Sequence, residues 1–167
     1  MMTKIRVRRA VADDLELLVR HRRGMFEAMG VKDARELAQA DRDYRRWARR
    51  LMRRGELVGF VASTGRVPVA SGCVWLQERQ PRPGFAGGGI PYLLSMFTEP
   101  SWRGRGLATK IVKAAVAWCR RSGFGVMTLH ASKMGRGVYE RLGFERTWEM
   151  RGTLRLGRLR RLRSLQG

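Results

Sequence analysis

Hydrophobic and polar residues repeat along this chain with two periods, which indicate strands and helices in turn. Alternating apolar positions predict strands at residues 4–10, 56–64, 67–78, 92–98, 126–130 and 144–151. Apolar positions three and four residues apart predict helices at residues 15–29, 33–54, 107–122 and 133–142. The order β-α-α-β-β-β-α-β-α-β favours an α/β (α+β) fold. We expect a mixed, mostly antiparallel sheet of six to seven strands, flanked by about four helices.

Residues with strong positional preferences support these boundaries. Asp13 and Asp14 precede the first predicted helix, where one is suited to the N-cap and the other to the first turn. Gly30, Gly123 and Gly143 follow predicted helices, where a glycine commonly ends the helix. The helix boundaries are therefore predicted by local chemistry as well as by periodicity.

The chain of 167 residues contains no internal repeat and no sign of a second core. We expect one domain over residues 1–152 and a basic C-terminal strand or tail over residues 153–167, with a short strand at Leu154–Leu156. Residues 79–91 are rich in glycine and proline and predict a long loop. No apolar run is long enough to cross a bilayer, and the N-terminus lacks the apolar core of a signal peptide. The expected location is the cytoplasm, without a membrane partner.

Positive charge is the unusual feature of the composition. Lysine and arginine total 35 against 14 acidic residues, which gives a net charge of +21. Seven arginines recur at three- and four-residue steps in the second predicted helix and form a basic stripe: Arg42, Arg45, Arg46, Arg49, Arg50, Arg53 and Arg54. Such a field attracts nucleic acid or other polyanions. A solvated face and an arginine-rich coding bias explain the same residues equally well, so both interpretations stay open.

Metal and disulfide chemistry find little support in the sequence. Cys73 falls in a predicted strand and Cys119 in a predicted helix, where a cysteine commonly serves as a small core residue. The two histidines are far apart in the chain and have no metal-ligand spacing to the cysteines. We expect no metal site.

A glycine-bearing turn joins the strand at residues 92–98 to the helix that starts at Leu107. Its sequence is Arg103-Gly104-Arg105-Gly106-Leu107-Ala108. A helix N-terminus has unpaired N–H groups and partial positive charge, and glycines let a phosphate approach the backbone closely. The turn lacks the GxxxxGK[ST] pattern of a P-loop and the third glycine of a dinucleotide fingerprint. It predicts an anion site, for which an ordinary tight turn is the alternative.

This turn resembles the central motif of the GNAT superfamily of N-acetyltransferases. That motif is Arg or Gln, two residues, Gly, one residue, and Gly or Ala, and here it consists of Arg103, Gly106 and Ala108. A second block, from Ser132 to Phe144, resembles the late helix of the family, which ends in Tyr-x-x-x-Gly-Phe. Two motifs in the right order and separation are more specific than either alone. The resemblance covers residues 5–150.

The resemblance implies that acetyl-CoA is the cosubstrate. Backbone amides of the turn would hold the pyrophosphate, Arg103 would shape the loop, and the end of the central strand would pair with the pantetheine arm and polarise the thioester carbonyl. Ser132 stands where many members have an asparagine that contacts the pantetheine. The cofactor-binding residues implied in this way are Met96, Phe97, Thr98, Arg103, Gly104, Arg105, Gly106, Leu107, Ala108, Thr109 and Ser132.

The same resemblance suggests the residues that react. Tyr139 matches the general acid near the coenzyme sulfur. Many members have a glutamate base on the central strand, and Tyr92 stands there instead. The candidates for the base are His130, Glu99 and a chain of water molecules, and histidine is the side chain that changes charge near neutral pH. By position in the fold, the acceptor would contact His21, Arg22, Met25, Phe26 and Tyr92.

The sequence thus favours an enzyme that moves an acetyl group from acetyl-CoA directly to a primary amine of a small molecule or peptide. The resemblance implies that the second helix, with its arginine stripe, borders the acceptor groove, and we therefore expect an anionic acceptor. Two other functions remain open. One is a nucleic-acid-directed protein, such as a toxin-like enzyme that acetylates charged tRNA, and the other is a regulatory domain that binds acetyl-CoA without turnover. A second copy of the chain is a further candidate partner.

Overall fold

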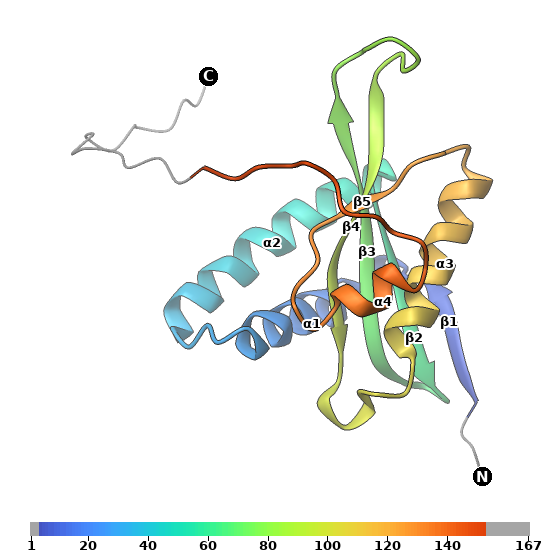
Figure 1. Ribbon diagram of the computed structural model, residues 1–167. Coiled ribbons are helices and arrows are strands. Elements are labelled where there is room, and N and C mark those ends of the chain that lie inside the picture. The colour runs from blue at the N-terminus through green and yellow to red at the C-terminus, as the bar shows by residue number, and fades with distance from the viewer. Residues whose placement is uncertain (1–3, 153–167) are drawn as a thin grey trace, which may run out of the picture.

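A twisted sheet separates the helices into two groups in the computed structural model, which describes residues 4–152 (Figure 1). The elements run β1 (Ile5–Arg9), a 3₁₀ turn at Ala12–Asp14, α1 (Leu15–Ala28), α2 (Ala34–Arg54), β2 (Leu57–Thr64), β3 (Val67–Arg79), β4 (Gly88–Thr98), a 3₁₀ turn at Pro100–Trp102, α3 (Leu107–Arg121), β5 (Thr128–Leu129) and α4 (Arg136–Glu140).

The described strands form one five-stranded sheet in the order β1-β2-β3-β4-β5. The first four strands are antiparallel neighbours, and β5 pairs with β4 in parallel. The tight turn from β2 to β3 is possible because Gly65 has a φ of 56°, in the left-handed region that glycine adopts readily. The predicted mixed, mostly antiparallel sheet with four flanking helices is therefore confirmed.

Each face of the sheet packs against its own helices (Figure 1). On one face, α3 packs Leu107, Ile111, Val112 and Ala115 against β2, β3 and β4. On the other face, α1 and α2 pack against the sheet through a separate set of buried residues: Leu15, Leu18, Val19, Tyr44, Ala48, Leu51, Leu57 and Cys73. Burial of each large apolar side chain contributes about 1.5–3 kcal/mol. These two cores hold β3 and β4 between the two helix layers.

Local chemistry sets the starts of α1 and α2, but the side chain that caps a helix is not the one predicted. Asp33 caps α2, where its carboxylate accepts hydrogen bonds from the N–H groups of Arg35 and Glu36. Asp14 precedes α1, but its carboxylate instead accepts two hydrogen bonds from Arg8, at 2.6 and 2.8 Å, and one from the N–H of Val11. Asp14 therefore ties β1 to the start of α1 rather than capping the helix.

The predicted strand at residues 144–151 does not form, so the sheet of the described residues has five strands where six to seven were predicted. Residues 144–152 have no strand partner among the described residues, and Trp148 and Met150 are 98% and 94% exposed. The alternating pattern is suited to a strand, but a strand also needs a neighbour, and β5 is only two residues long. The strand predicted at residues 154–156 lies outside the described part of the chain.

Three other boundaries differ from the prediction. The hairpin of β3 and β4 extends to the pair Arg79 and Gly88, so the predicted loop at residues 79–91 is shorter than expected. The helix predicted at residues 133–142 is reduced to α4, and the strand predicted at residues 126–130 to β5. Short elements carry little periodicity, which is why their ends were poorly predicted.

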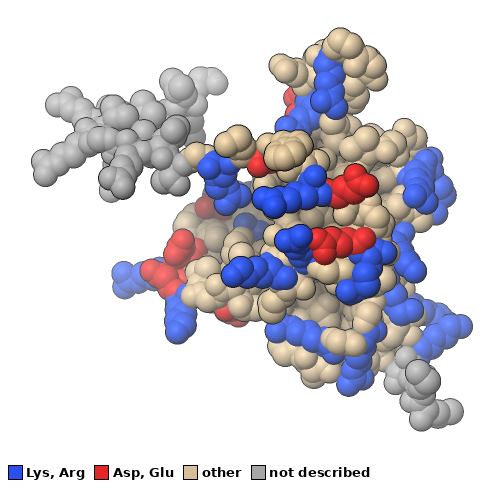
Figure 2. Space-filling model, in the orientation of Figure 1, with Lys and Arg blue, Asp and Glu red and all other residues tan. Residues whose placement is uncertain are grey.

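The surface is strongly basic, and Figure 2 shows lysine and arginine spread over several elements, with acidic residues between them. Cys73 and Cys119 are both buried, as expected for small core residues, and burial raises the pKa of the Cys73 thiol to about 12. Among residues 4–152, no helix is both long and apolar enough to cross a membrane.

Candidate active site

The turn before α3 is shaped to hold an anion. Gly104 and Gly106 have φ values of 74° and 72°, and the space beside their α-carbons is open. Gly106 precedes a helix of 15 residues, so the N–H groups of its first turn have no partner within the helix. Arg103 and Arg105 stand within the turn. These features fit a bound pyrophosphate.

Arg103 contacts the end of β4 from within the turn. Its Nε donates a hydrogen bond to the backbone oxygen of Thr98 at 3.2 Å, and its guanidinium lies 6.0 Å from the ring centre of Phe97. Arg105 stacks on Trp102 at 4.7 Å. Arg103 therefore connects the turn to the end of β4, and both arginines add positive charge beside the open glycines.

A bulge in β4 breaks the sheet beside this turn. Ser71 pairs with Phe97 but Cys73 pairs with Leu94, so β4 has one extra residue, and Ser95 has a φ of 54°. Gly72 lies opposite on β3, where a Cβ would overlap the side-chain sulfur of Met96. A larger residue at this position would therefore require the Met96 side chain to move.

On its other edge, β4 pairs with β5 only at Tyr92 and Leu93. The backbone of residues 94–98 has no strand partner there among the described residues. An unpaired strand edge offers N–H and C=O groups to an extended ligand. The pantetheine arm of a coenzyme A molecule is such a ligand, and Met96, Phe97 and Thr98 all lie in this segment.

Tyr139 lies on α4, which packs against α3. Its ring is half-buried and meets Phe144 edge to face, with ring centres 5.9 Å apart. Burial raises the pKa of the Tyr139 hydroxyl above its usual value. The hydroxyl is therefore protonated at neutral pH and able to donate a proton.

Ser132 has a local partner. Its Oγ accepts a hydrogen bond from the N–H of Gly135 at 3.1 Å, within the turn that leads into α4. The sequence predicted an N-cap here for a helix starting at Lys133, whereas α4 begins only at Arg136. The side chain of Ser132 thus stabilises the turn, and a contact with pantetheine stays a prediction.

His130 is the centre of one polar cluster. The Tyr92 hydroxyl forms a hydrogen bond with His130 Nδ1, and His130 Nε2 lies 3.2 Å from Glu149 Oε1. Tyr92 is on β4, His130 follows β5, and Glu149 lies in the segment after α4. Burial, followed by the charge of Glu149, raises the pKa of the Tyr92 hydroxyl. Three separate parts of the chain therefore meet at this exposed cluster.

His21 is the centre of a second, buried cluster. Its Nδ1 lies 2.9 Å from the Ser71 hydroxyl, and its Nε2 lies 3.4 Å from Glu99 Oε1 without forming a hydrogen bond. The ring contacts Phe97, with centroids 5.1 Å apart. Burial, with a smaller contribution from Arg20, lowers the pKa of His21 to about 4. His21 is thus neutral at physiological pH and packs behind the end of β4.

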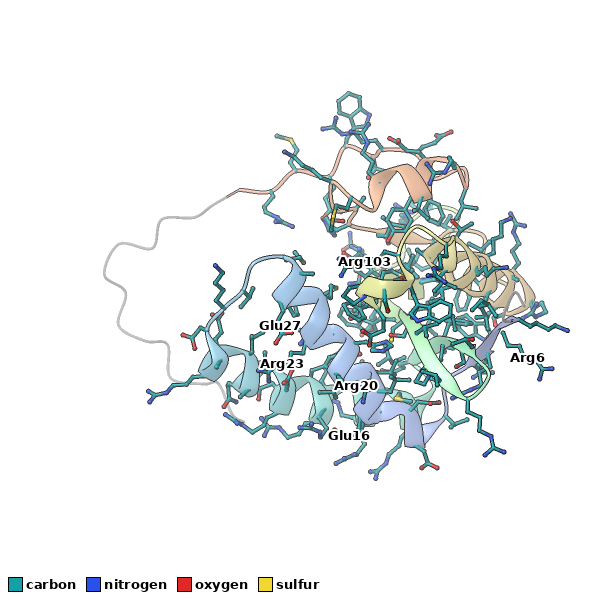
Figure 3. All side chains as sticks on the ribbon, turned by 90° about the horizontal axis from the view of Figure 1, so that it is seen from below. Arg6, Glu16, Arg20, Arg23, Glu27 and Arg103 are labelled. Atoms are coloured by element: carbon teal, nitrogen blue, oxygen red, sulfur yellow. The ribbon has the colours of Figure 1, made fainter. Side chains whose placement is uncertain are left out.

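The other predicted acceptor residues lie farther along α1. Arg22, Met25 and Phe26 are all half-buried. Figure 3 shows α1 between α2 and the turn that carries Arg103, with Glu16, Arg20, Arg23 and Glu27 following one another along the helix. The helix therefore lines the face of the sheet on which Tyr92 and Leu94 lie.

Most of the arginine stripe is exposed on the outer face of α2. The apolar residues of α2, including Tyr44, Ala48 and Leu51, face the core. Six of the seven stripe arginines are exposed, and Arg45 instead donates hydrogen bonds to Glu16 of α1. Five of them line a hollow in this outer face: Arg46, Arg49, Arg50, Arg53 and Arg54. The stripe makes no hydrogen bond or ion pair with the clusters around His21 and His130 among the described residues. The contacts therefore give no support to the idea that it borders the acceptor groove.

Sequence reasoning missed Ser95 and Glu149. Ser95 falls inside the predicted strand at residues 92–98, and only the register of β3 against β4 reveals the bulge. Glu149 falls in a predicted strand that does not form. Neither residue belongs to a motif, and a bulge depends on the partner strand, so the sequence offers no clear signal for either.

Comparison with known proteins agrees with this geometry. The sequence model of the Acetyltransferase (GNAT) family matches residues 16–144. A GCN5-related N-acetyltransferase from Ralstonia eutropha JMP134, solved as a crystal structure, is 32% identical and has a TM-score of 0.81, with 90% of this chain and 99% of that chain covered. A predicted acetyltransferase from Clostridium acetobutylicum, solved with acetyl-CoA, is 26% identical, also with a TM-score of 0.81, and the match covers 90% of this chain and 96% of that one.

An uncharacterized N-acetyltransferase of Methanocaldococcus jannaschii is 29% identical over 122 residues, which is 67% of this chain. The match spans about half, 51%, of that relative's length. Acetyltransferases of this family take the acetyl group from acetyl-CoA, so the predicted cosubstrate is confirmed together with the predicted resemblance. The match of the family model over most of the chain shows that the protein belongs to the GNAT family of acetyltransferases.

Proposed function

We propose that this protein transfers the acetyl group of acetyl-CoA directly to a primary amine of a small molecule or peptide. The observation that carries the proposal is the meeting of two features, an open glycine turn at the start of α3 and the bulged, unpaired edge of β4 beside it. The turn suits the pyrophosphate, and the strand edge suits the pantetheine arm. Acetyl-CoA supplies an activated acetyl group at the end of that arm.

In this proposal the chain positions the reacting atoms with its backbone. The N–H groups at residues 104–109 bind the pyrophosphate, helped by the positive end of α3. A backbone N–H at Met96 or Thr98 donates a hydrogen bond to the thioester carbonyl. A donor that is held in place before the reaction contributes several kcal/mol to stabilising the transition state.

We infer that the amine loses its proton to Tyr92 and His130 acting together. Tyr92 donates its own proton to His130 Nδ1 while its oxygen accepts the proton of the amine, so Tyr92 stays neutral and His130 becomes an imidazolium. Glu149, 3.2 Å from Nε2, stabilises that positive charge. The raised pKa of Tyr92 keeps its hydroxyl protonated at the start of this transfer.

Tyr139 is the proposed general acid, which protonates the departing thiolate. Tyr139→Phe removes one hydroxyl and little volume, so the packing against Phe144 is expected to persist. Turnover is expected to fall roughly 10²-fold, a typical contribution of general acid–base catalysis. Acetyl-CoA affinity, measured by calorimetry, should barely change. Turnover equal to that of the wild type would show that Tyr139 has only a structural role.

The proposed function is tested by measuring CoA release from acetyl-CoA across a panel of primary amines. Gly106→Glu is expected to abolish acetyl-CoA binding, because a side chain and a negative charge would enter the phosphate site. Gly65→Glu is the matched control, since Gly65 also has a positive φ and open space but lies in the turn between β2 and β3. Equal acetyl-CoA affinity in the two folded variants would contradict the assignment.

A second candidate function follows from the outer face of α2. Arg49, Arg50 and Arg53 line the hollow there and form no ion pair or hydrogen bond with an acidic side chain among the described residues. Such a surface suits a nucleic acid, including the charged tRNA of a nucleic-acid-directed acetyltransferase. This candidate predicts that nucleic acid copurifies at low salt and dissociates at high salt. A protein free of nucleic acid at low salt would leave the outer face of α2 as a solvated surface.

A further inference from the structure

Arg22 differs from the other arginines of α1 in its surroundings. Its guanidinium lies over two aromatic rings, 4.7 Å from the ring centre of Phe26 and 4.5 Å from that of Tyr44. The residue is half-buried, and burial lowers the pKa of its guanidinium. It forms no hydrogen bond and no ion pair with any described residue. A positive charge is thus held between two rings with its N–H donors unfilled by the protein.

The neighbouring arginine on α1 has acidic partners for its N–H donors. Arg23 donates to Glu27 at 3.0 Å and to Asp41 at 2.9 Å. Asp41 is also the acid whose charge acts on Arg22, but its carboxylate is engaged by Arg23. A guanidinium has five N–H donors, and ring faces compensate its charge without accepting those donors as a carboxylate does. Arg22 therefore retains the capacity to bind an anion.

The position of Arg22 connects it to the proposed site of transfer. Tyr44, one of its two ring partners, has its hydroxyl 3.9 Å from Cys73 Sγ, and Cys73 pairs with Leu94 of β4. Leu94 directly precedes Ser95, the bulge residue of β4. Tyr44 and Cys73 thus connect Arg22 to the part of β4 at which the acetyl group would lie. An anion at Arg22 would lie on the face of the sheet that α1 and α2 cover.

We propose that Arg22 binds an anionic group of the acceptor, a carboxylate or a phosphate, so that the acceptor is an amine and an anion in the same molecule. This inference rests on the proposed acetyl transfer. A planar guanidinium recognises both anions through paired hydrogen bonds, and partial burial strengthens that recognition. The exposed stripe on α2 has neither the aromatic neighbours nor the link to the bulge. The surroundings of Arg22 therefore indicate an anionic acceptor, which the net charge of the chain alone did not establish.

The experiment compares acceptors that differ only in the anion. Each standard amino acid is paired with its C-terminal amide, and aminoethyl phosphate is paired with ethanolamine, with CoA release as the measured rate. For wild-type protein we expect kcat/KM to be at least about 10-fold higher for the anionic member of the best pair. A carboxylate source and a phosphate source are distinguished by which pair shows the larger preference.

Arg22→Gln should reduce kcat/KM for the preferred anionic acceptor by roughly 10²-fold, mainly through KM, and change the rate for its neutral counterpart by less than about twofold. Arg20→Gln is the matched control, because Arg20 is exposed on the same helix. The control should leave both rates unchanged. If the Gln variant fails to fold, Arg22→Lys keeps the charge but loses the paired hydrogen bonds and should still reduce the preference for the anion.

Three outcomes would overturn the inference. A preference of the wild type for neutral or cationic amines would exclude an anionic acceptor. Equal losses for both members of a pair in the Arg22 variants would show that Arg22 has a structural role only. Absence of CoA release with every amine, anionic and neutral, would instead reject the proposed function, and the inference with it.

Discussion

The chain contains two histidines, and each lies between a hydroxyl group and a glutamate. His21 has Ser71 at Nδ1 and Glu99 near Nε2, while His130 has Tyr92 at Nδ1 and Glu149 near Nε2. The side chain of His21 is 1% exposed and that of His130 is 51% exposed. The same three kinds of group therefore occur once inside the protein and once at its surface.

Burial gives the two clusters different roles. Desolvation opposes the charged form of an imidazole, so His21 is held neutral, with its pKa lowered to about 4. A group that cannot gain a proton near neutral pH serves poorly as a base, and His21 instead supports α1 against the end of β4. His130 is exposed to solvent and is therefore accessible to an acceptor. Exposure, and not the set of neighbours, separates the structural histidine from the proposed catalytic one.

The largest expected difference is in turnover. His130→Gln should reduce kcat by roughly 10²- to 10⁴-fold, the contribution expected of a general base, with little change in melting temperature. His21→Gln should reduce kcat much less and lower the melting temperature instead, because it disturbs a buried contact with Ser71. Parallel assays of CoA release and thermal unfolding distinguish the two. The opposite pattern would reverse the roles assigned here.

A second difference is expected in the pH dependence of stability. The folded-state pKa of His21, about 4, lies below the unfolded value of 6.5, so the unfolded chain binds more protons between these pH values. The contribution of neutral His21 is complete above pH 6.5 and is lost as the pH falls to about 4. The loss amounts to about 3 kcal/mol.

Denaturant unfolding between pH 4 and pH 7 measures this contribution. Replacement of the imidazole in His21→Gln should remove the corresponding part of the pH dependence, whereas His130→Gln should retain it. If wild type and His21→Gln lost stability equally on acidification, burial of His21 would not be the source of the pH dependence.

The smallest expected difference concerns the two glutamates. Glu149→Gln should reduce kcat by about 10-fold, because the imidazolium of His130 would lose its neighbouring negative charge. Glu99→Gln, beside a histidine that stays neutral, should change kcat by less than about twofold. CoA release at saturating acceptor measures both. A larger loss for Glu99→Gln would point to Glu99 as the base and reopen that alternative.

The sequence by itself determined the elements that depend on neighbouring residues. The turn at residues 103–108 and the Tyr139 motif are local, so their residues alone indicate the family and the cosubstrate. The long helices α1, α2 and α3 and the strands β1 to β3 were predicted nearly to the residue, because amphipathic periodicity and caps act over a few positions. These features require no knowledge of what lies across the sheet.

Only the tertiary structure decided which distant residues meet. The bulge at Ser95 depends on the register of β4 against β3, and the meeting of Tyr92, His130 and Glu149 depends on three segments far apart in the chain. The two histidines illustrate this dependence most clearly. The sequence predicted contact with the acceptor for His21 and a reacting role for His130, but it did not indicate which side chain is buried. Burial is a property of the packed chain, and it is burial that determines whether an imidazole can accept a proton.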